Sequence, residues 1–162
     1  MKKITNFDEA IIAIKENFNN ITSVSDELKN NREVATLAVT RNSHVLQHIS
    51  SDLKNDYDIV LIAVSGDGIT IAYASKELRD NIQLAVIAVK NDPMAMRFVS
   101  ERLQNDRQLL EIYLSGEDDE LVNKVHGNFR TQCRIKLKAY QEQEWMCNNI
   151  TNNNTKSKLT KF

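Results

Sequence analysis

Two histidines, His44 and His48, are the residues whose types and spacing most directly suggest metal chemistry. On an α-helix, a separation of four residues places both imidazoles on one face, where they can bind one zinc ion. A zinc site needs further ligands, and neither a third histidine nor a cysteine lies near them in the sequence. The equivalent positions of the two following repeats hold apolar residues: Ile69 and Tyr73, then Met94 and Phe98. We therefore expect a packing or surface role for the histidine pair and predict no metal site.

A column of large side chains, His48, Tyr73 and Phe98, recurs at intervals of 25 residues, with Gln47 and Arg97 as sequence neighbours. We favour burial in the core, because aromatic stripes are usually buried. The alternative is a ladder on one face, since aromatic residues beside an arginine are typical of protein-binding hot spots. Helical repeats also use such ladders to bind single-stranded RNA. RNA binding needs several basic side chains in line, whereas Arg97 stands alone and the net charge is −1.

No other group of residues predicts catalysis or cofactor binding. The sequence Gly66-Asp67-Gly68 lacks the Lys and Ser/Thr of a phosphate-binding loop, so we interpret it as a helix break. The acidic residues 117–120 lack the spaced pattern of an EF-hand and suit the start of a helix. Without a nucleophile paired with a base, a metal-ligand set or a cofactor loop, we expect that the chain is not an enzyme.

The two cysteines, Cys133 and Cys147, lie fourteen residues apart in one predicted helix. That separation is about 21 Å along a helix, which is too long for a disulfide between them. We predict two free thiols in a reducing compartment. Because Cys133 falls on an apolar stripe, we expect it to be buried and Cys147 to be more exposed.

The elements that position these residues follow a 25-residue repeat. One column is leucine and one is serine: Leu28, Leu53, Leu78 and Leu103, with Ser25, Ser50, Ser75 and Ser100. A third column is always Asn or Asp: Asn6, Asn31, Asp56, Asn81 and Asp106. These side chains accept hydrogen bonds from the free backbone N–H groups of a starting helix. We predict that a helix begins after each of them.

The first helix of each repeat is expected to span about ten residues, with two apolar columns. These are Ile12, Leu37, Ile62, Ile87 and Ile112, and Ile14, Val39, Val64, Val89 and Leu114. An alanine column between them marks a close approach of a second helix: Ala13, Ala38, Ala63 and Ala88, replaced by Tyr113 in the fifth repeat. Gly and Asn residues after the helix tolerate the left-handed conformation that closes it.

A second helix of about ten residues is expected to follow, because its apolar residues are spaced i, i+3, i+7. In the second repeat these are Leu46, Ile49 and Leu53. The serine of the serine column is expected to bond a carbonyl of the preceding turn, and replacing Ser50 and Ser75 with leucine should lower stability.

The predicted fold is all-α, a solenoid-like stack of about five helix-turn-helix repeats with a longer C-terminal capping helix over residues 128–147. Four Gly and one Pro in 162 residues favour such long regular elements over a sheet. We expect a single helical-repeat domain over residues 1–147. Residues 148–162 are rich in Asn, Thr and Lys and are expected to form a disordered polar tail.

No apolar run approaches the roughly 20 residues that span a bilayer. The first ten residues do not form a signal peptide, because Asp8 and Glu9 precede any apolar run. With the free thiols, these features predict a cytoplasmic protein.

The segment from Leu53 to Leu78 resembles a known family, the domain of unknown function 4116. The resemblance rests on Leu-Lys-Asn-Asp at 53–56, Ala-Val at 63–64 and Ala-Ser at 74–75. It covers about Glu27 to Leu114, with a weaker echo in Asn6–Asp26. Members are similar tandem helical units of intracellular bacteria and protists, without assigned catalytic residues. The resemblance implies a helical interaction module from a bacterium that delivers proteins into host cells.

We expect a protein–protein interaction module, that is a scaffold, adaptor or inhibitor, either a secreted bacterial effector or a regulator of one. Its expected contact residues are His48, Tyr73, Phe98, Gln47 and Arg97. The alternative is single-stranded RNA binding through the aromatic column, and an enzyme is the weakest hypothesis. The sequence predicts another protein as partner and no cofactor, and it leaves the oligomeric state open.

Overall fold

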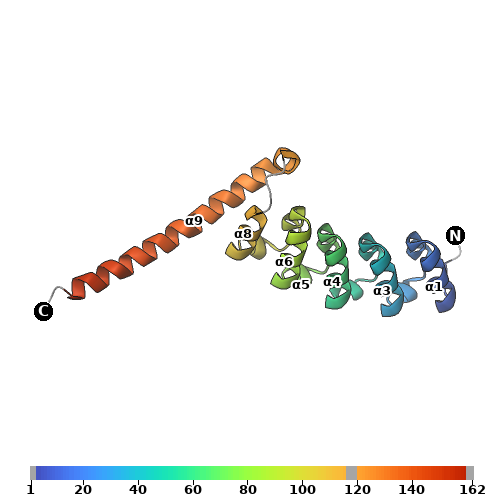
Figure 1. Cartoon of the computed structure of the whole chain (residues 1–162). Coiled ribbons are helices and arrows are strands. Elements are labelled where there is room, and N and C mark those ends of the chain that lie inside the picture. Colours follow the sequence, from blue (N-terminus) through green and yellow to red (C-terminus); the bar gives the residue numbers. More distant parts are fainter. Residues whose placement is uncertain (1–2, 116–119, 160–162) are drawn as a thin grey trace. The chain divides into compact units, whose positions relative to one another are not determined.

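The computed structural model describes the backbone of residues 3–115 and 120–159, and the side chains of residues 3–115 and 127–147 (Figure 1). The chain forms two compact units, Met1–Gln104 and Asn105–Phe162. The described residues are helical apart from short connections and one isolated bridge between Ile4 and Val24, which confirms the all-α prediction. Within these residues, no helix is long and apolar enough to cross a membrane. The solenoid and the single domain over residues 1–147 stay predictions.

The first helix of each repeat begins where the sequence predicts. These helices are α1 (Phe7–Glu16), α3 (Arg32–Arg41), α4 (Tyr57–Gly66), α6 (Ile82–Asn91) and α8 (Arg107–Ser115). Each starts after the Asn or Asp of the third column, whose side-chain oxygen accepts a backbone N–H in the first turn. The side-chain cap therefore fixes the start of every repeat.

These helices end differently from the prediction, because the described residues include no positive φ. In the first four repeats the closing residue is extended, with φ from −139° to −156°: Asn17, Asn42, Asp67 and Asp92. Its side-chain oxygen accepts the N–H two residues later and begins a 3₁₀ helix. These 3₁₀ helices are η1 (Phe18–Ser23), η2 (Ser43–His48), η4 (Gly68–Tyr73) and η5 (Pro93–Arg97). An Asx turn thus replaces the left-handed cap.

The single second helix predicted for each repeat is wrong, since a third short segment follows the 3₁₀ helix. These segments are α2 (Asp26–Lys29), η3 (Leu53–Asn55), α5 (Lys76–Arg79) and α7 (Glu101–Gln104). The serine column lies at the break, and each serine oxygen accepts the N–H of the leucine three residues later. Serine therefore caps a new helix. The predicted bond from this serine to a carbonyl of the preceding turn is wrong.

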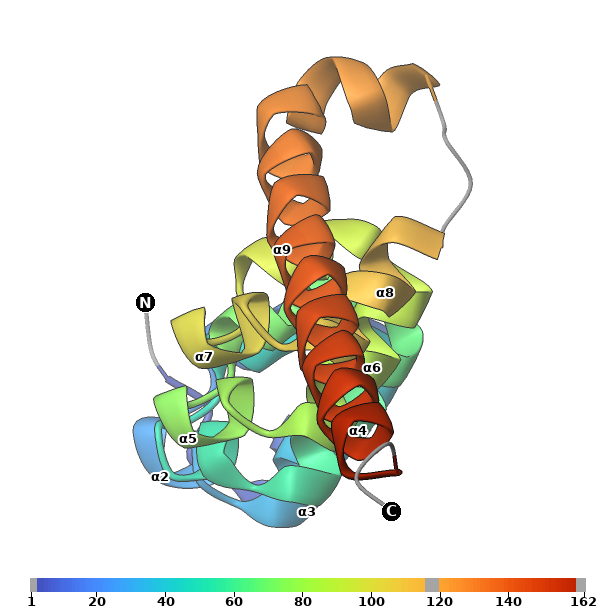
Figure 2. The ribbon, with the colours of Figure 1, turned by 90° about the vertical axis from the view of Figure 1, so that its left-hand side faces the viewer.

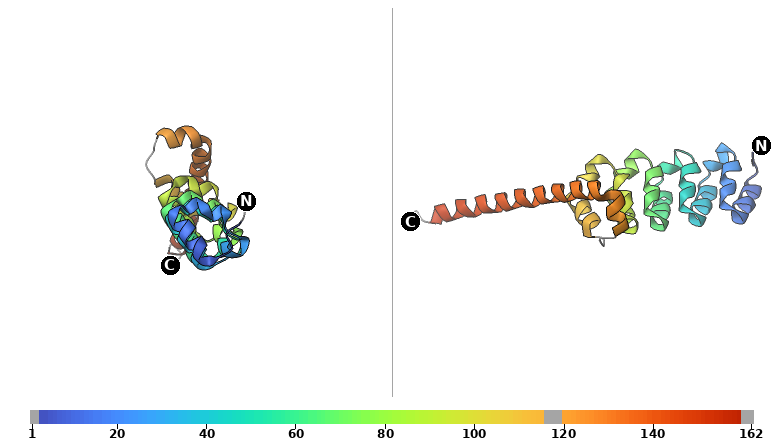
Figure 3. Two further views of the ribbon diagram at one scale, coloured as in Figure 1. Left: turned by 90° about the vertical axis from the view of Figure 1, so that its right-hand side faces the viewer. Right: turned by 90° about the horizontal axis from the view of Figure 1, so that it is seen from above.

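Equivalent elements of successive repeats lie side by side in the N-terminal unit, where α1 contacts α3, α3 contacts α4, and α4 contacts α6. Figure 2 shows α2, α5 and α7 together on one side, away from α4 and α6. Figure 3 shows the repeats of this unit following one another in chain order. The core between them contains the predicted columns Ala38, Ala63 and Ala88, and Ile14, Val39, Val64 and Val89. The alanines let neighbouring elements approach closely, as predicted.

The C-terminal unit consists of α8 and the long helix α9 (Glu120–Leu159). The Tyr113 and Phe129 rings meet edge to face at 5.8 Å, and the Arg130 guanidinium lies 5.6 Å from the Tyr113 ring centroid. Tyr140 donates a 2.6 Å hydrogen bond to the Asn105 carbonyl. The helix start expected at residue 128 is wrong, because α9 passes through Gly127 without a break. It also continues through residues 148–159 of the expected tail, whereas acidic residues 117–119 lie outside the described residues.

Candidate interaction surfaces

The predicted aromatic column lies on the surface of the N-terminal unit, so the favoured interpretation as core is wrong. His48 is exposed, and Tyr73 and Phe98 are half-buried at or just after the ends of their 3₁₀ helices. The core position of each of these helices is filled two residues earlier, by Leu46, Ile71 and Met96. A 3₁₀ helix has three residues per turn, so a side chain two positions after a buried one points away from the core. Gln47 and Arg97, the predicted neighbours, are exposed.

The histidine pair does not share a face as an α-helical pair would, because η2 is a 3₁₀ helix. His44 Nε2 lies 2.9 Å from Asp67 Oδ2 of the next repeat. The His44 ring also meets the Tyr73 ring edge to face, with centroids 6.2 Å apart. His44 therefore contacts two residues of the next repeat, Asp67 and Tyr73. Within the described part of the chain, no cluster of three or more His, Cys, Asp or Glu side chains could hold a metal ion.

A row of mostly aliphatic side chains on the first helices lies at the surface and is partly exposed. We call it the aliphatic stripe: Ile11 and Ile12 of α1, Thr36 and Leu37 of α3, Leu61 and Ile62 of α4, and Val86 and Ile87 of α6. Ile12 is 57% exposed, and the other members are half-buried. Of the two apolar columns of the first helices, the one from Ile12 to Ile87 therefore lies at the surface. Ile112, its counterpart in α8, is also half-buried.

The reason for this exposure is visible in α4, where Ile59 to Val64 are six consecutive apolar residues. Ile59, Val60, Ala63 and Val64 are buried, which leaves Leu61 and Ile62 facing outward. An amphipathic helix with one buried face places polar residues at such positions. The unbroken apolar run is the signal in the sequence that could have identified the stripe.

Charged residues line both edges of the aliphatic stripe. Asp8, Glu33 and Asp58 are exposed on one edge, one helical turn before the stripe positions, and Lys15 and Lys90 are exposed one turn after them. Between α1 and α3 the stripe deepens into a groove of about 530 Å³. The groove is lined by Ile11, Lys15, Arg32, Glu33, Thr36 and Leu37. Its lining combines apolar side chains with two cations, Lys15 and Arg32, and one carboxylate, Glu33.

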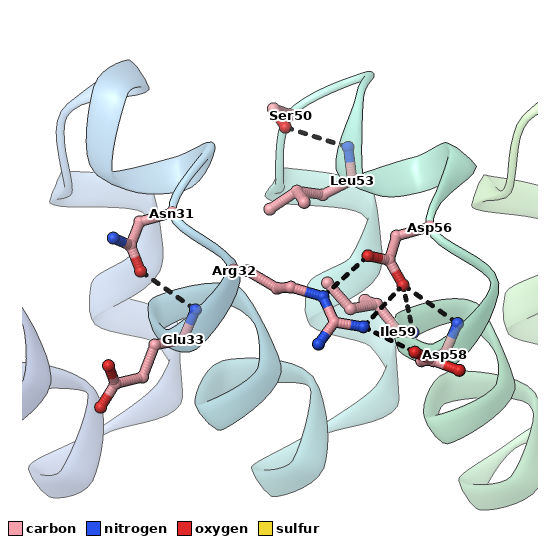
Figure 4. A network of polar contacts seen from close by, with 8 residues as sticks. All are labelled: Asn31, Arg32, Glu33, Ser50, Leu53, Asp56, Asp58 and Ile59. Atoms are coloured by element: carbon pink, nitrogen blue, oxygen red, sulfur yellow. Dashed lines mark hydrogen bonds and ion pairs between the residues drawn. The ribbon is translucent and has the colours of Figure 1, made fainter.

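Arg32 on the rim of this groove is held by the next repeat (Figure 4). Its Nε lies 2.9 Å from Asp56 Oδ2, and its Nη2 lies 2.7 Å from Asp58 Oδ2. The hydrogen bond from Arg32 lowers the pKa of Asp56, and the two carboxylates raise the pKa of Arg32. Asp56 also caps α4 through the N–H groups of Asp58 and Ile59. The rim is therefore fixed before any partner arrives.

The repeats that carry both surfaces match a known family. Its sequence model, described as "Domain of unknown function (DUF4116)", matches residues 6–53, 31–79 and 81–116. The chain belongs to this family. The matches begin at Asn6, Asn31 and Asn81, the caps of α1, α3 and α6, so the family unit and the structural repeat start at the same residue. No curated protein and no solved structure matches the chain. The family description names no activity, and the two surfaces are the features of the chain that bear on its function.

Proposed function

We propose that the chain is a protein-interaction module, a scaffold, adaptor or inhibitor, that binds a partner protein along the aliphatic stripe. The observation that carries the proposal is a continuous row of seven aliphatic side chains on four neighbouring helices, of which Ile12 is exposed and the others keep part of their surface in solvent. Single apolar residues are common on the surfaces of soluble proteins. A contiguous apolar patch is uncommon there and marks a binding surface. Helices also hold such side chains more rigidly than loops, which reduces the entropy lost on binding.

The charged edges favour a partner of defined chemistry, an amphipathic helix. Such a helix places apolar residues at i, i+3 or i+4 and i+7 into an apolar groove. The groove between α1 and α3 offers the apolar side chains of Ile11 and Leu37. Basic side chains of the helix would face Glu33, and acidic ones would face Lys15. These rim charges would set its orientation and rate of association more than its affinity.

The aromatic column is a second contact surface in this proposal. Tyr73 and Phe98 keep part of their rings in solvent, and Gln47, His48 and Arg97 are exposed beside them. Aromatic residues and arginine are enriched among residues that dominate protein binding. The carboxylate of Asp67 lies against His44, which contacts Tyr73, so this region is mixed in charge. A single-stranded RNA site would need an unbroken basic groove beside the rings.

We also propose a reducing compartment such as the cytoplasm, either of a bacterium or, for a translocated effector, of its host. Cys133 is a buried thiol with no second cysteine among the described side chains around it. Free buried thiols are typical of reducing compartments. The host-cell destination is supported by the family resemblance alone.

Affinity capture with the whole chain tests the proposal when variants of the two surfaces are compared. Leu37→Lys should lose the specific partner, whereas Tyr73→Ala and Phe98→Ala should weaken its capture. Ser51→Lys adds the same charge at an exposed position outside both surfaces and should capture as the wild type does. In parallel, single-stranded RNA is titrated by fluorescence anisotropy at about 50 and about 200 mM salt. Tight RNA binding that weakens steeply with salt would overturn the ranking in favour of RNA.

A further inference from the structure

The long helix α9 has two apolar faces, of which one lies against the start of its own unit. That face includes Phe129, Cys133 and Tyr140, which contact or lie buried near α8. The other face carries Ile135, Trp145 and Met146, which are 64%, 68% and 51% exposed. Large apolar and aromatic side chains at this exposure, on a helix that already has a packed face, need an explanation.

The exposed face has the spacing of a two-helix seam. Ile135, Ala139, Glu142 and Met146 follow one another at intervals of four, three and four residues. This is the spacing of the a and d positions of a coiled coil, which face a partner helix. We call these four residues the seam. Lys138 and Trp145 lie along one side of it, and Lys138 Nζ is 3.9 Å from Glu142 Oε1.

We propose that a second copy of this chain docks antiparallel along the seam, so that the exposed face of α9 is a dimer interface. A two-fold axis between residues 140 and 141 places Ile135 of each chain opposite Met146 of the second copy. The same axis brings Lys138 of each chain beside Glu142 of the second copy. Every contact occurs twice, as an isologous interface requires.

The order of charges along the helix selects this arrangement. In a parallel pair in register, Glu142 would face Glu142 of the second copy, and like charges in contact are unfavourable. In the antiparallel pair, Glu142 faces the small side chain of Ala139 and can reach the lysine of the second copy. A single polar residue in a seam of this kind specifies register and orientation. The charges of α9 therefore complement those of a second copy only when the two helices are antiparallel.

A hollow beside the seam gives the apolar end of the second copy a place to bind. It measures about 440 Å³ and is bordered by Lys138, Gln141, Glu142, Trp145 and Met146. In the antiparallel pair, Ile135 of the second copy lies against this hollow and covers the Trp145 ring. The seam between Ile135 and Met146 is about 18 Å long. An interface this short predicts a weak, reversible dimer.

The dimer does not depend on the aliphatic stripe, which lies on other helices. It would place two copies of the N-terminal unit in one particle. A partner with two binding sites would then bind more tightly than its single affinity predicts.

Sedimentation velocity of the whole chain at about 1 to 200 μM tests the dimer by mass action. Trp145 is the only tryptophan of the sequence, so its emission should shift to shorter wavelength as the dimer forms. Lys138→Glu alone and Glu142→Lys alone should each weaken the dimer about tenfold or more, because each places like charges together twice. Lys76→Glu, at an exposed lysine of the N-terminal unit, is the control and should dimerise normally.

Mixing the two variants in equal amounts provides the sharpest test. In the mixed pair, each substituted position meets the opposite charge, so a dimer should return at concentrations where each variant alone is monomeric. The pair of Lys138 with Glu142 inside one helix cannot explain this rescue, because mixing does not restore it within either chain. A wild-type chain that stays monomeric at the highest concentration would overturn the proposal. A dimer whose affinity is unchanged by both substitutions would also overturn it. So would two variants that do not form a dimer when they are mixed.

Discussion

The hydroxyl of Ser75 donates a 2.6 Å hydrogen bond to the side-chain oxygen of Asn55, which belongs to the preceding repeat. The same serine oxygen accepts the N–H of Leu78 at 3.1 Å, and the Ser75 N–H donates to the Lys54 carbonyl at 2.9 Å. Ser50 and Ser100 make the equivalent bonds to Asn30 and Asp80. One small side chain thus begins a helix and joins two repeats, which explains why serine recurs in this column.

Ser50→Ala should therefore lower the free energy of unfolding by about 1–2 kcal/mol, because it removes a helix cap and a cross-repeat hydrogen bond together. Ser51→Ala changes the exposed serine next to it and should be nearly neutral. Urea denaturation of the two variants measures the difference. Equal stability of the two would show that the serine column has no structural role of this kind.

The contact between Ser100 and Asp80 should make stability depend on pH, because the equivalent contacts of Ser50 and Ser75 use an asparagine, which does not titrate. The Ser100 hydroxyl, and after it the Arg102 guanidinium 3.0 Å away, lower the pKa of Asp80. A lowered folded-state pKa adds stability above the unfolded-state pKa of about 3.9, and this stability is lost as pH falls through the folded-state pKa. Asp80→Asn keeps an acceptor for Ser100 and cannot titrate.

Urea midpoints of the wild type and Asp80→Asn, measured from about pH 7 to about pH 2.5, test this contact. The wild type should be the more stable at neutral pH, and its advantage should disappear in acid. Asp52→Asn, at an exposed aspartate, controls for the loss of a negative charge. An advantage that is constant over the whole range would contradict the assigned role of Asp80.

The helix starts were predictable from the sequence because their determinants are local. Asn31 caps α3 through the N–H groups of Glu33 and Val34, two and three residues away. The second half of each repeat was not predictable in this way, since Ser50 bonds Asn30, twenty residues earlier, as well as Leu53. The i, i+3, i+7 spacing of Leu46, Ile49 and Leu53 suits one helix, whereas the serine between them starts a new one.

The candidate surfaces were harder to predict, because the burial of a side chain depends on which other helices pack against it. The sequence identifies His48, Tyr73 and Phe98 as a column. They lie at the surface because the segments that carry them are 3₁₀ helices, which the apolar spacing did not predict. Ile62 lies beside the buried Ala63 in an unbroken apolar run, which indicates that some residues of the run face outward but does not reveal which ones. Only the packing of α3 and α6 against α4 does so.

Two glycines of the Gly66-Asp67-Gly68 break should differ sharply in their tolerance of alanine. A Cβ at Gly68 would lie 2.1 Å from the carbonyl oxygen of Ala88, a backbone atom of the next repeat. A Cβ at Gly66 would meet only the Ser43 hydroxyl, which can rotate away. Gly68→Ala should therefore cost about 1–3 kcal/mol of stability, and Gly66→Ala should cost less. Thermal or urea denaturation compares them, and the reverse order would refute the close approach at Gly68.

The two thiols should react at different rates with a thiol reagent such as DTNB. Cys147 is exposed, whereas Cys133 is buried, and its burial raises the pKa of the thiol. Because the thiolate is the reactive form, Cys147 should react first and Cys133 slowly. Cys147→Ser should remove the fast phase of the reaction. If this variant loses the slow phase and keeps the fast one, the assignment of the buried face of α9 is wrong.

The central claim, that the aliphatic stripe binds a partner protein, is tested most directly by one ratio of dissociation constants. The captured partner is titrated against Ile62→Lys and against the control Ser51→Lys by isothermal titration calorimetry. Lysine at position 62 can extend its charge into solvent, so both variants should remain folded, as circular dichroism and urea denaturation will check. We predict that Ile62→Lys binds at least about tenfold more weakly than the control, because the stripe loses an apolar contact at its centre. Equal dissociation constants for two folded variants would contradict the account.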